Sequence, residues 1–220
     1  MIKAILFDMD GVIIDSEPLH HKAYHAMFDE VGITVSDQLY ESFTGRATIQ
    51  ICQDLVRYFD LAARAEELVA IKRRNFKHLF FNDPDLDLIA GVRELIEDYY
   101  NNGLTLVLAS SASMPNINNV FQRFGLERYF KGKLSGADLK ASKPHPEIFL
   151  RAAEVSGCKK EECMVIEDST NGIQAAHTAG IYCVAFKSEH SKNQEYTLAN
   201  KVISDFGEIS FNRLKSLTSF

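Results

Sequence analysis

Short, continuous apolar runs that each end in a polar residue constrain the fold of this chain more than any other feature of the sequence. The first run, residues 3–7, leads into Asp8, and another, residues 104–109, leads into Ser110. A strand that is covered on both faces needs apolar side chains at every position, whereas a half-exposed strand alternates apolar and polar residues. These runs therefore predict buried parallel strands. Three further runs have the same character: residues 163–166, 182–186 and 201–203.

Helical periods of apolar residues lie between these runs. Four of them fall between residues 92 and 179, and each is followed by a glycine where a left-handed helix C-terminus is expected. Strand and helix thus alternate from residue 104 onward, which predicts an α/β fold with a doubly wound, Rossmann-like parallel sheet. The four glycines are Gly103, Gly125, Gly157 and Gly180.

Residues 16–82 differ from the rest because they contain no strand-like run and carry four helical patterns in sequence. The first pattern begins after Ser16 and ends before Gly32. An all-helical block after the first strand predicts a four-helix cap inserted into a core formed by residues 1–15 and 83–220. We expect its joints at Asp15–Ser16 and at residues 82–85, and we interpret the acidic residues of the second joint as a hydrated hinge.

The composition excludes several classes of protein. With 24 basic against 30 acidic side chains the net charge is −6, which argues against a nucleic-acid or anionic-membrane partner. No apolar run approaches the roughly 18 residues of a membrane span, and Asp8 and Asp10 interrupt the only apolar stretch at the N-terminus, so no signal peptide is expected. Four cysteines without CxxC spacing predict free thiols in the cytoplasm rather than disulfides or a zinc site: Cys52, Cys158, Cys163 and Cys183.

Two of the runs lead into groups that suit phosphate chemistry. Asp8 and Asp10 follow directly on the first run, and two carboxylates so close in a low dielectric repel each other unless a cation joins them. Taken alone, this Asp-Met-Asp-Gly segment is equally compatible with a plain turn. Ser110 and Ser111 end the second run, where a hydroxyl and backbone N–H groups suit phosphate oxygens.

Two more groups complete the set. Lys143 lies in Ser-Lys-Pro-His-Pro, a loop stiffened by two prolines, and by itself it is typical of a solvated surface lysine. Glu167 and Asp168 end the run 163–166, where Asp168 could instead cap the following helix. Because ligands of parallel α/β sheets bind outside the carboxyl ends of the strands, the four groups together predict one site at that edge.

The segment Phe-Asp-Met-Asp-Gly-Val-Ile-Ile-Asp-Ser-Glu-Pro-Leu-His, residues 7–20, resembles the first motif of the haloacid dehalogenase superfamily. The resemblance extends over essentially the whole chain and is to the branch that contains β-phosphoglucomutase and many sugar-phosphate phosphatases, whose four-helix cap is inserted at the same place. It implies that Asp8 is the nucleophile that forms an aspartyl-phosphate. It implies that Asp10 is the general acid/base, with a backbone carbonyl that also binds Mg²⁺.

The same resemblance gives roles to the other groups. Ser110 matches the phosphate-binding hydroxyl, with Ser111 beside it, and Lys143 matches the lysine of the third motif. Asp168 matches a ligand of Mg²⁺, the expected cofactor, with Glu167 as a direct or water-mediated companion. These roles agree with the chemistry, because phosphoryl transfer needs a positioned nucleophile and charge neutralisation, and Mg²⁺ prefers oxygen ligands.

Three features of the helical block bear on the substrate. His20 resembles a histidine that supports Asp10 from the cap side, although it could equally be a helix-face histidine. Thr44-Gly-Arg46 resembles the cap loop that meets the substrate in this branch, and Arg46 could grip a second anionic group. We interpret Lys72-Arg-Arg74 as a solvated basic helix face, the alternative being a cation presented to the site.

These observations predict a monomeric, Mg²⁺-dependent phosphatase of small phosphorylated metabolites, sugar phosphates in particular, that works through an aspartyl-phosphate. The alternative is a hexose-phosphate mutase of the β-phosphoglucomutase kind, in which a returning sugar hydroxyl rather than water attacks that intermediate. A pyrophosphatase and a non-catalytic binding module remain as further alternatives, the latter disfavoured because Asp8, Asp10, Lys143 and Asp168 are all present. A dehalogenase is disfavoured because carbon–halogen displacement needs no Mg²⁺ and would leave Asp10 and Asp168 without a role.

Overall fold

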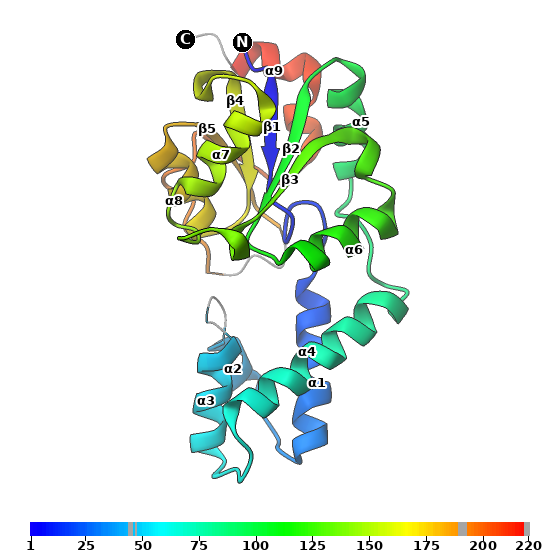
Figure 1. The fold of residues 1–220 in the computed structure, drawn as a ribbon, viewed down its shortest axis with the longest axis vertical. Helices are drawn as coiled ribbons and strands as arrows, with labels where there is room; N and C mark the ends of the chain where they lie inside the picture. The colour runs from blue at the N-terminus through cyan, green and yellow to red at the C-terminus, as the bar shows by residue number, and fades with distance from the viewer. Residues whose placement is uncertain (44–45, 47, 189–192, 218–220) are drawn as a thin grey trace. The chain divides into compact units, whose positions relative to one another are not determined.

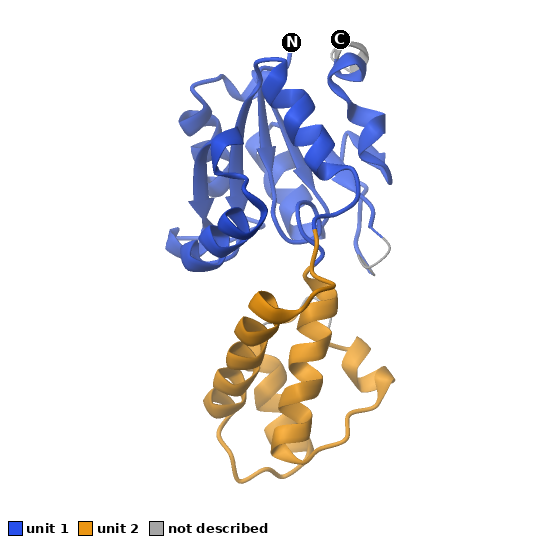
Figure 2. Ribbon diagram, turned by 90° about the vertical axis from the view of Figure 1, so that its right-hand side faces the viewer, with its two compact units in different colours: residues 1–15, 88–220 blue, residues 16–87 orange. Residues whose placement is uncertain are grey.

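The structure is a computed structural model that describes residues 1–43, 46, 48–188 and 193–217. The chain divides into two compact units, residues 1–15 with 88–220 and residues 16–87 (Figure 2). The first unit is an α/β core and the second is entirely helical over its described residues. The helical insert after the first strand is therefore confirmed.

A six-stranded parallel sheet forms the centre of the core unit, in the order β3-β2-β1-β4-β5-β6 (Figure 1). The chain runs outward from β1 in one direction through β2 and β3, and in the other through β4, β5 and β6, which confirms the doubly wound topology. The strands are β1 Ala4–Phe7, β2 Thr105–Ser110, β3 Phe130–Ser135, β4 Cys163–Glu167, β5 Tyr182–Phe186 and β6 Lys201–Ile203.

Helices cover both faces of this sheet, so the central strands are buried on both sides. On one face α7 (Glu147–Ser156) and α8 (Thr170–Ala179) pack against side chains of β1, β2 and β4. On the other face α5 (Val92–Asn101) packs against β2, and α9 (Phe211–Leu217) contacts α5. All four residues of β1 are buried, which explains why the continuous apolar runs predicted these strands.

Strand β3 was not predicted from the sequence. This strand lies at the edge of the sheet and pairs with β2 alone, so most of its side chains are only half-buried. Its sequence, Phe-Lys-Gly-Lys-Leu-Ser, accordingly lacks a continuous apolar run. The helix that precedes it, α6 (Met114–Phe124), ends at Gly125 in the left-handed conformation, as predicted.

The helical unit contains four helices over its described residues: α1 Glu17–Val31, α2 Asp37–Glu41, α3 Thr48–Tyr58 and α4 Ala65–Asn82. An apolar cluster between them includes Met27, Cys52, Leu55 and Leu68. The four predicted helical patterns correspond to these four helices.

The second joint between the units differs from the expectation. The division lies after Asp87 rather than after Asn82. Asp83 is only 6% exposed, and its carboxylate accepts a hydrogen bond of 2.6 Å from Lys22 Nζ on α1. The interpretation of this segment as a hydrated hinge is therefore wrong at Asp83, because this ion pair fixes the end of α4 to α1.

Two further findings concern the whole described chain. No helix among the described residues is both long enough and apolar enough to span a membrane. All four cysteines are free thiols, and three of them are buried.

Candidate active site

The predicted site residues of the core gather at the carboxyl ends of β1, β2 and β4. The strand register aligns Phe7 with Leu108 on one side and with Ile166 on the other. Asp8 therefore lies one residue beyond β1, at the same level as Glu167 at the end of β4. Because β1 is the strand from which the chain winds in both directions, this edge is where a doubly wound sheet binds its ligands (Figure 1).

Lys143 joins all three of these strand ends. Its Nζ donates to Asp8 Oδ1 at 2.5 Å, to Glu167 Oε1 at 2.7 Å and to the backbone carbonyl of Ala109 at 3.0 Å. The Lys143 side chain is only 5% exposed, and its Nζ lies 4.9 Å from the centre of the Phe149 ring. The reading of Lys143 as a surface lysine is thereby ruled out, since it is the buried counterion of two acidic residues.

The charges in this cluster shift one another's pKa values. Burial raises the pKa of Asp8 well above its usual range and the carboxylates of Glu167 and Asp168 add to this, although Lys143 acts in the opposite direction. Burial alone would lower the pKa of Lys143, but the charges of Asp8 and Glu167 outweigh it and raise that pKa. Lys143 therefore remains a cation, whereas burial disfavours the charged form of Asp8.

Three carboxylates form a group that could hold a metal ion. One oxygen from each of Asp8, Glu167 and Asp168 lies within 4.8 Å of the other two. A donor set made only of carboxylate oxygens suits a hard cation such as Mg²⁺. The Asp10 carboxylate is not part of this group; the resemblance implied a backbone carbonyl from that residue.

Gly11 makes room for the Asp168 carboxylate. Its φ of +80° lies in the left-handed region, and a Cβ atom built there would lie 2.1 Å from Asp168 Oδ2. Any side chain at this position would displace the carboxylate. The glycine of the first motif is therefore explained by close packing between the loop after β1 and the loop after β4.

Both carboxylate oxygens of Glu167 accept hydrogen bonds. Its Oε2 accepts from Asp168 N at 2.8 Å, from Ser169 N at 2.8 Å and from Ser169 Oγ at 3.0 Å. Its Oε1 accepts from Lys143, and a Cβ at Gly172 would lie 1.7 Å from that oxygen. The Glu167 carboxylate thus folds back on the turn that carries Asp168 and holds it in place.

The role of Ser169 was not predicted from the sequence. Ser169 is the N-cap of α8, and its Oγ accepts from Gly172 N at 3.1 Å. The N-cap of this helix is therefore Ser169 rather than Asp168. A serine before a helix is a recognised N-cap signal, so the sequence did contain the information.

Ser110 and Ser111 differ in exposure. Ser110, the last residue of β2, is only 1% exposed, and its Oγ accepts from Ala112 N at 3.0 Å. Ser111 is exposed. Because the Ser110 oxygen accepts a hydrogen bond, its own proton can be donated to another group, as a phosphate-binding hydroxyl requires.

His20 and Lys72 form a part-buried pair inside the helical unit. His20 Nδ1 lies 2.7 Å from Lys72 Nζ, and its ring stacks on Phe76 with 4.5 Å between the ring centres. Burial, and then the charge of Lys72, lower the pKa of His20 to about 3, so this imidazole is neutral. Lys72 is only 5% exposed and its Nζ lies 5.0 Å from the ring centre of Tyr24. The interpretation of residues 72–74 as a solvated face is therefore wrong for Lys72.

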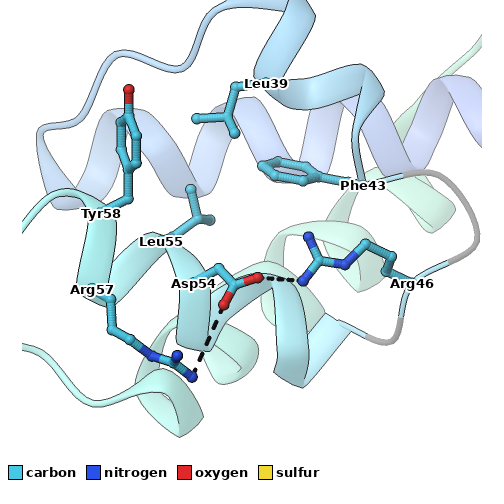
Figure 3. Close-up of a pocket in the computed structure, with 7 residues that line it drawn as sticks. All are labelled: Leu39, Phe43, Arg46, Asp54, Leu55, Arg57 and Tyr58. Atoms are coloured by element: carbon cyan, nitrogen blue, oxygen red, sulfur yellow. Dashed lines mark hydrogen bonds and ion pairs between the residues drawn. The ribbon is translucent and has the colours of Figure 1, made fainter.

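Arg46 lies in a pocket of the helical unit with a volume of about 370 Å³. Its guanidinium forms an ion pair with one Asp54 carboxylate oxygen, while Arg57 lies 4.0 Å from the other (Figure 3). Thr44 and Gly45, the other residues of the predicted substrate loop, lie outside the described residues. The pocket is lined by Leu39, Phe43, Arg46, Asp54, Leu55, Arg57 and Tyr58.

The chain is similar to known proteins over most of its length. A family model described as haloacid dehalogenase-like hydrolase matches residues 5–186. A phosphorylated carbohydrates phosphatase from Thermotoga maritima is 32% identical over 184 residues, which cover 82% of each chain. A crystal structure of a candidate beta-phosphoglucomutase from the same organism is 30% identical, with a TM-score of 0.84 over 98% of this chain and 99% of the other.

A third relative has been solved with a phosphorylated sugar. CbbY from Rhodobacter sphaeroides, in complex with xylulose-1,5-bisphosphate, is 25% identical, with a TM-score of 0.78 over 94% of this chain and 96% of the other. The family match covers most of the chain, and homologues that cover 82% and 98% of it are named as a phosphatase and a candidate phosphoglucomutase. The protein therefore belongs to the haloacid dehalogenase-like hydrolases and is an enzyme of that family.

Proposed function

We propose that this enzyme is a Mg²⁺-dependent phosphatase of small phosphorylated metabolites, sugar phosphates in particular, that works through an aspartyl-phosphate on Asp8. The observation that carries the proposal is the buried contact of 2.5 Å between Lys143 Nζ and Asp8 Oδ1, beside the oxygens of Glu167 and Asp168. A carboxylate next to both a fixed cation and a cation-binding group suits attack on a phosphoryl group, whose charge must be neutralised. The name of the Thermotoga maritima relative, a phosphatase of phosphorylated carbohydrates, supports the substrate class.

The first step transfers the phosphoryl group to Asp8. A carboxylate oxygen of Asp8 forms a bond to phosphorus while the bond from phosphorus to the leaving oxygen breaks, and Asp10 gives that oxygen a proton. Lys143 neutralises part of the charge on the phosphoryl oxygens, and the Ser110 hydroxyl donates to another of them. A Mg²⁺ ion held by the Asp8 and Asp168 carboxylates would supply further charge neutralisation.

The second step releases phosphate. Asp10, now a carboxylate, takes a proton from water, whose oxygen bonds to phosphorus as the bond to Asp8 breaks. Inorganic phosphate leaves, and both aspartates return to their starting states. Glu167 orients Lys143 and the Asp168 turn, because both of its oxygens already accept hydrogen bonds from them.

The helical unit is proposed to act as the cap that excludes water and selects the substrate. The chain crosses between the two units only twice, after Asp15 and after Asp87, so the helices can move as one body. Arg46 is the candidate for contact with a second anionic group of the substrate. The bisphosphate bound by CbbY supports such a group in this family.

A phosphomutase is the second candidate, favoured by the TM-score of 0.84 to a candidate beta-phosphoglucomutase. The two reactions share the first step and differ in what attacks the aspartyl-phosphate, so one experiment tests both. Phosphate release is measured on a panel of sugar phosphates, with Mg²⁺ and with EDTA. A parallel reaction follows conversion of β-glucose 1-phosphate to glucose 6-phosphate in the presence of the corresponding glucose bisphosphate as activator.

Mg²⁺-dependent phosphate release without isomer formation supports the phosphatase. Isomer formation that outpaces phosphate release supports the mutase. Asp8→Asn serves as the control for contaminating phosphatases in both reactions. Absence of both activities, or equal rates in Mg²⁺ and EDTA, would refute the proposal.

A further inference from the structure

The first turn of α8 makes a contact with a residue far along the chain, outside the segment 167–172 that contains Asp168. Within this segment, Asp168 N and Ser169 N donate to Glu167 Oε2, and Gly172 N donates to Ser169 Oγ. Thr170 N instead donates to Gln194 Oε1 at 2.7 Å, and Gln194 lies 24 residues further along the chain. The N–H groups at a helix start have no partner within the helix, so this external acceptor serves an N–H group in addition to the one bound by the Ser169 cap.

The contact between the two segments runs in both directions. The Thr170 hydroxyl donates to Gln194 Oε1 at 2.9 Å and accepts from Glu195 N at 2.8 Å. Three hydrogen bonds therefore tie residues 194–195 to Thr170, and we call this group the Gln194 clamp. Gln194 uses one side-chain oxygen for two donors, so an apolar side chain of the same length would remove both contacts.

The clamp lies next to the group that could hold a metal ion. Thr170 is two residues beyond Asp168, whose carboxylate already packs closely against Gly11. A small shift of the turn would move the Asp168 oxygens relative to Asp8 and would also strain the three hydrogen bonds that Glu167 Oε2 accepts from this turn. Residues that orient metal ligands affect affinity although they do not touch the ion.

We propose that Gln194 is a positioning residue that, through Thr170, holds the Glu167–Asp168 turn in the geometry that binds Mg²⁺. This inference rests on the proposed function, because it concerns the same metal group. Gln194 acts one step further from the ion than a residue that touches a ligand directly. Its loss should therefore weaken Mg²⁺ binding by about threefold to tenfold, below the roughly 10- to 100-fold range of direct partners.

The alternative is that the clamp only anchors the segment after β5. In that case Gln194→Met would lower the midpoint of thermal unfolding but leave Mg²⁺ affinity unchanged. The two roles are therefore separated by measuring metal binding itself, without substrate and without turnover.

The experiment is a calorimetric titration of Mg²⁺ into the full chain, with thermal unfolding in EDTA as a check of the fold. Gln194→Met removes the acceptor, whereas Gln194→Glu keeps it. Gln174→Met makes the same chemical change at an exposed position of α8 and serves as the matched control. Thr170→Val and Thr170→Ser test the same clamp from its other side, so the test does not depend on one variant that folds poorly.

We expect weaker Mg²⁺ binding in Gln194→Met and Thr170→Val. Wild-type affinity, within about twofold, is expected in Gln194→Glu, Thr170→Ser and Gln174→Met. Unchanged affinity in both Gln194→Met and Thr170→Val, with the wild type binding Mg²⁺, would overturn this inference and leave the proposed function intact. Failure of the wild-type chain to bind Mg²⁺ would overturn both.

Discussion

Replacing Asp8 by asparagine should abolish turnover and, at the same time, stabilise the metal-free enzyme. If all three carboxylates are ionised, each repulsion between Asp8 and its two acidic neighbours, at no more than 4.8 Å, costs at least about 3.5 kcal/mol at an effective dielectric constant of about 20. The attraction to Lys143 at 2.5 Å contributes about 6.5 kcal/mol on the same basis. The two repulsions together therefore at least offset the attraction.

What remains is the cost of burying a charged carboxylate, which is several kcal/mol and which a neutral amide largely avoids. This agrees with the raised pKa of Asp8, whose largest cause is burial. Because an amide also loses hydrogen bonds of full strength to Lys143, we expect a net stabilisation of only about 1–3 kcal/mol. Active-site groups often lower the stability of the folded protein, so their removal can raise stability while it abolishes activity.

Thermal unfolding in EDTA measures the stability, and 1–3 kcal/mol corresponds to a rise in Tm of roughly 3–9 °C for a chain of this length. Asp138→Asn, at an exposed position of the core unit, is the matched control and should leave Tm unchanged. Turnover on an aryl phosphate with Mg²⁺ should fall below a few per cent of the wild-type rate, because an amide is a poor nucleophile. A lower Tm in Asp8→Asn would refute the electrostatic argument, and retained turnover would refute the nucleophile assignment.

Three further predictions concern Asp10, Lys143 and Arg46. Asp10→Asn should slow turnover by roughly 10²–10⁴-fold, as loss of a general acid/base does, yet keep Mg²⁺ binding in calorimetry; a loss of affinity as large as in Asp168→Asn would contradict its role. Lys143→Met should lower the free energy of unfolding by about 3–5 kcal/mol in urea denaturation, because it leaves buried carboxylates unpaired, and a neutral effect would contradict that reasoning. Arg46→Ala should raise KM for substrates with a second anionic group more than it slows a small aryl phosphate, whereas an equal loss on every substrate would remove Arg46 from substrate selection.

The parts of the fold that sequence predicted are those where burial dictates residue type. The strands β1, β2 and β4 are covered on both faces, so nearly every position is apolar and the runs are unmistakable. The edge strand β3 has one neighbour and polar side chains, and no local pattern distinguishes it from a loop.

The site was predicted in position but not in contacts. Topology alone predicts that polar groups at the ends of parallel strands meet at one edge of the sheet. Asp8, Ser110 and Glu167 lie at such strand ends. The placement of Lys143 depends on how a loop 135 residues away from Asp8 returns to the sheet, which no local pattern encodes. The burial of Lys72 was not predicted either. Its basic neighbours in the sequence suggest a solvated face, whereas packing against Tyr24 of α1 removes the Lys72 side chain from water.

Glu167 connects the two halves of this site. One of its oxygens accepts from Lys143, the cation that pairs with Asp8, and the other accepts from the backbone of the turn that carries Asp168. Asp8, Lys143 and the turn that carries Asp168 are therefore members of a single network of interactions. In such a network the loss of one member changes the hydrogen bonding and the charge of the others, so single substitutions measure the network and not an isolated contact. The same coupling explains why a clamp at Thr170, remote from the phosphoryl group, bears on the site: a displacement of the turn at Asp168 reaches Lys143, and through it Asp8, by way of one carboxylate.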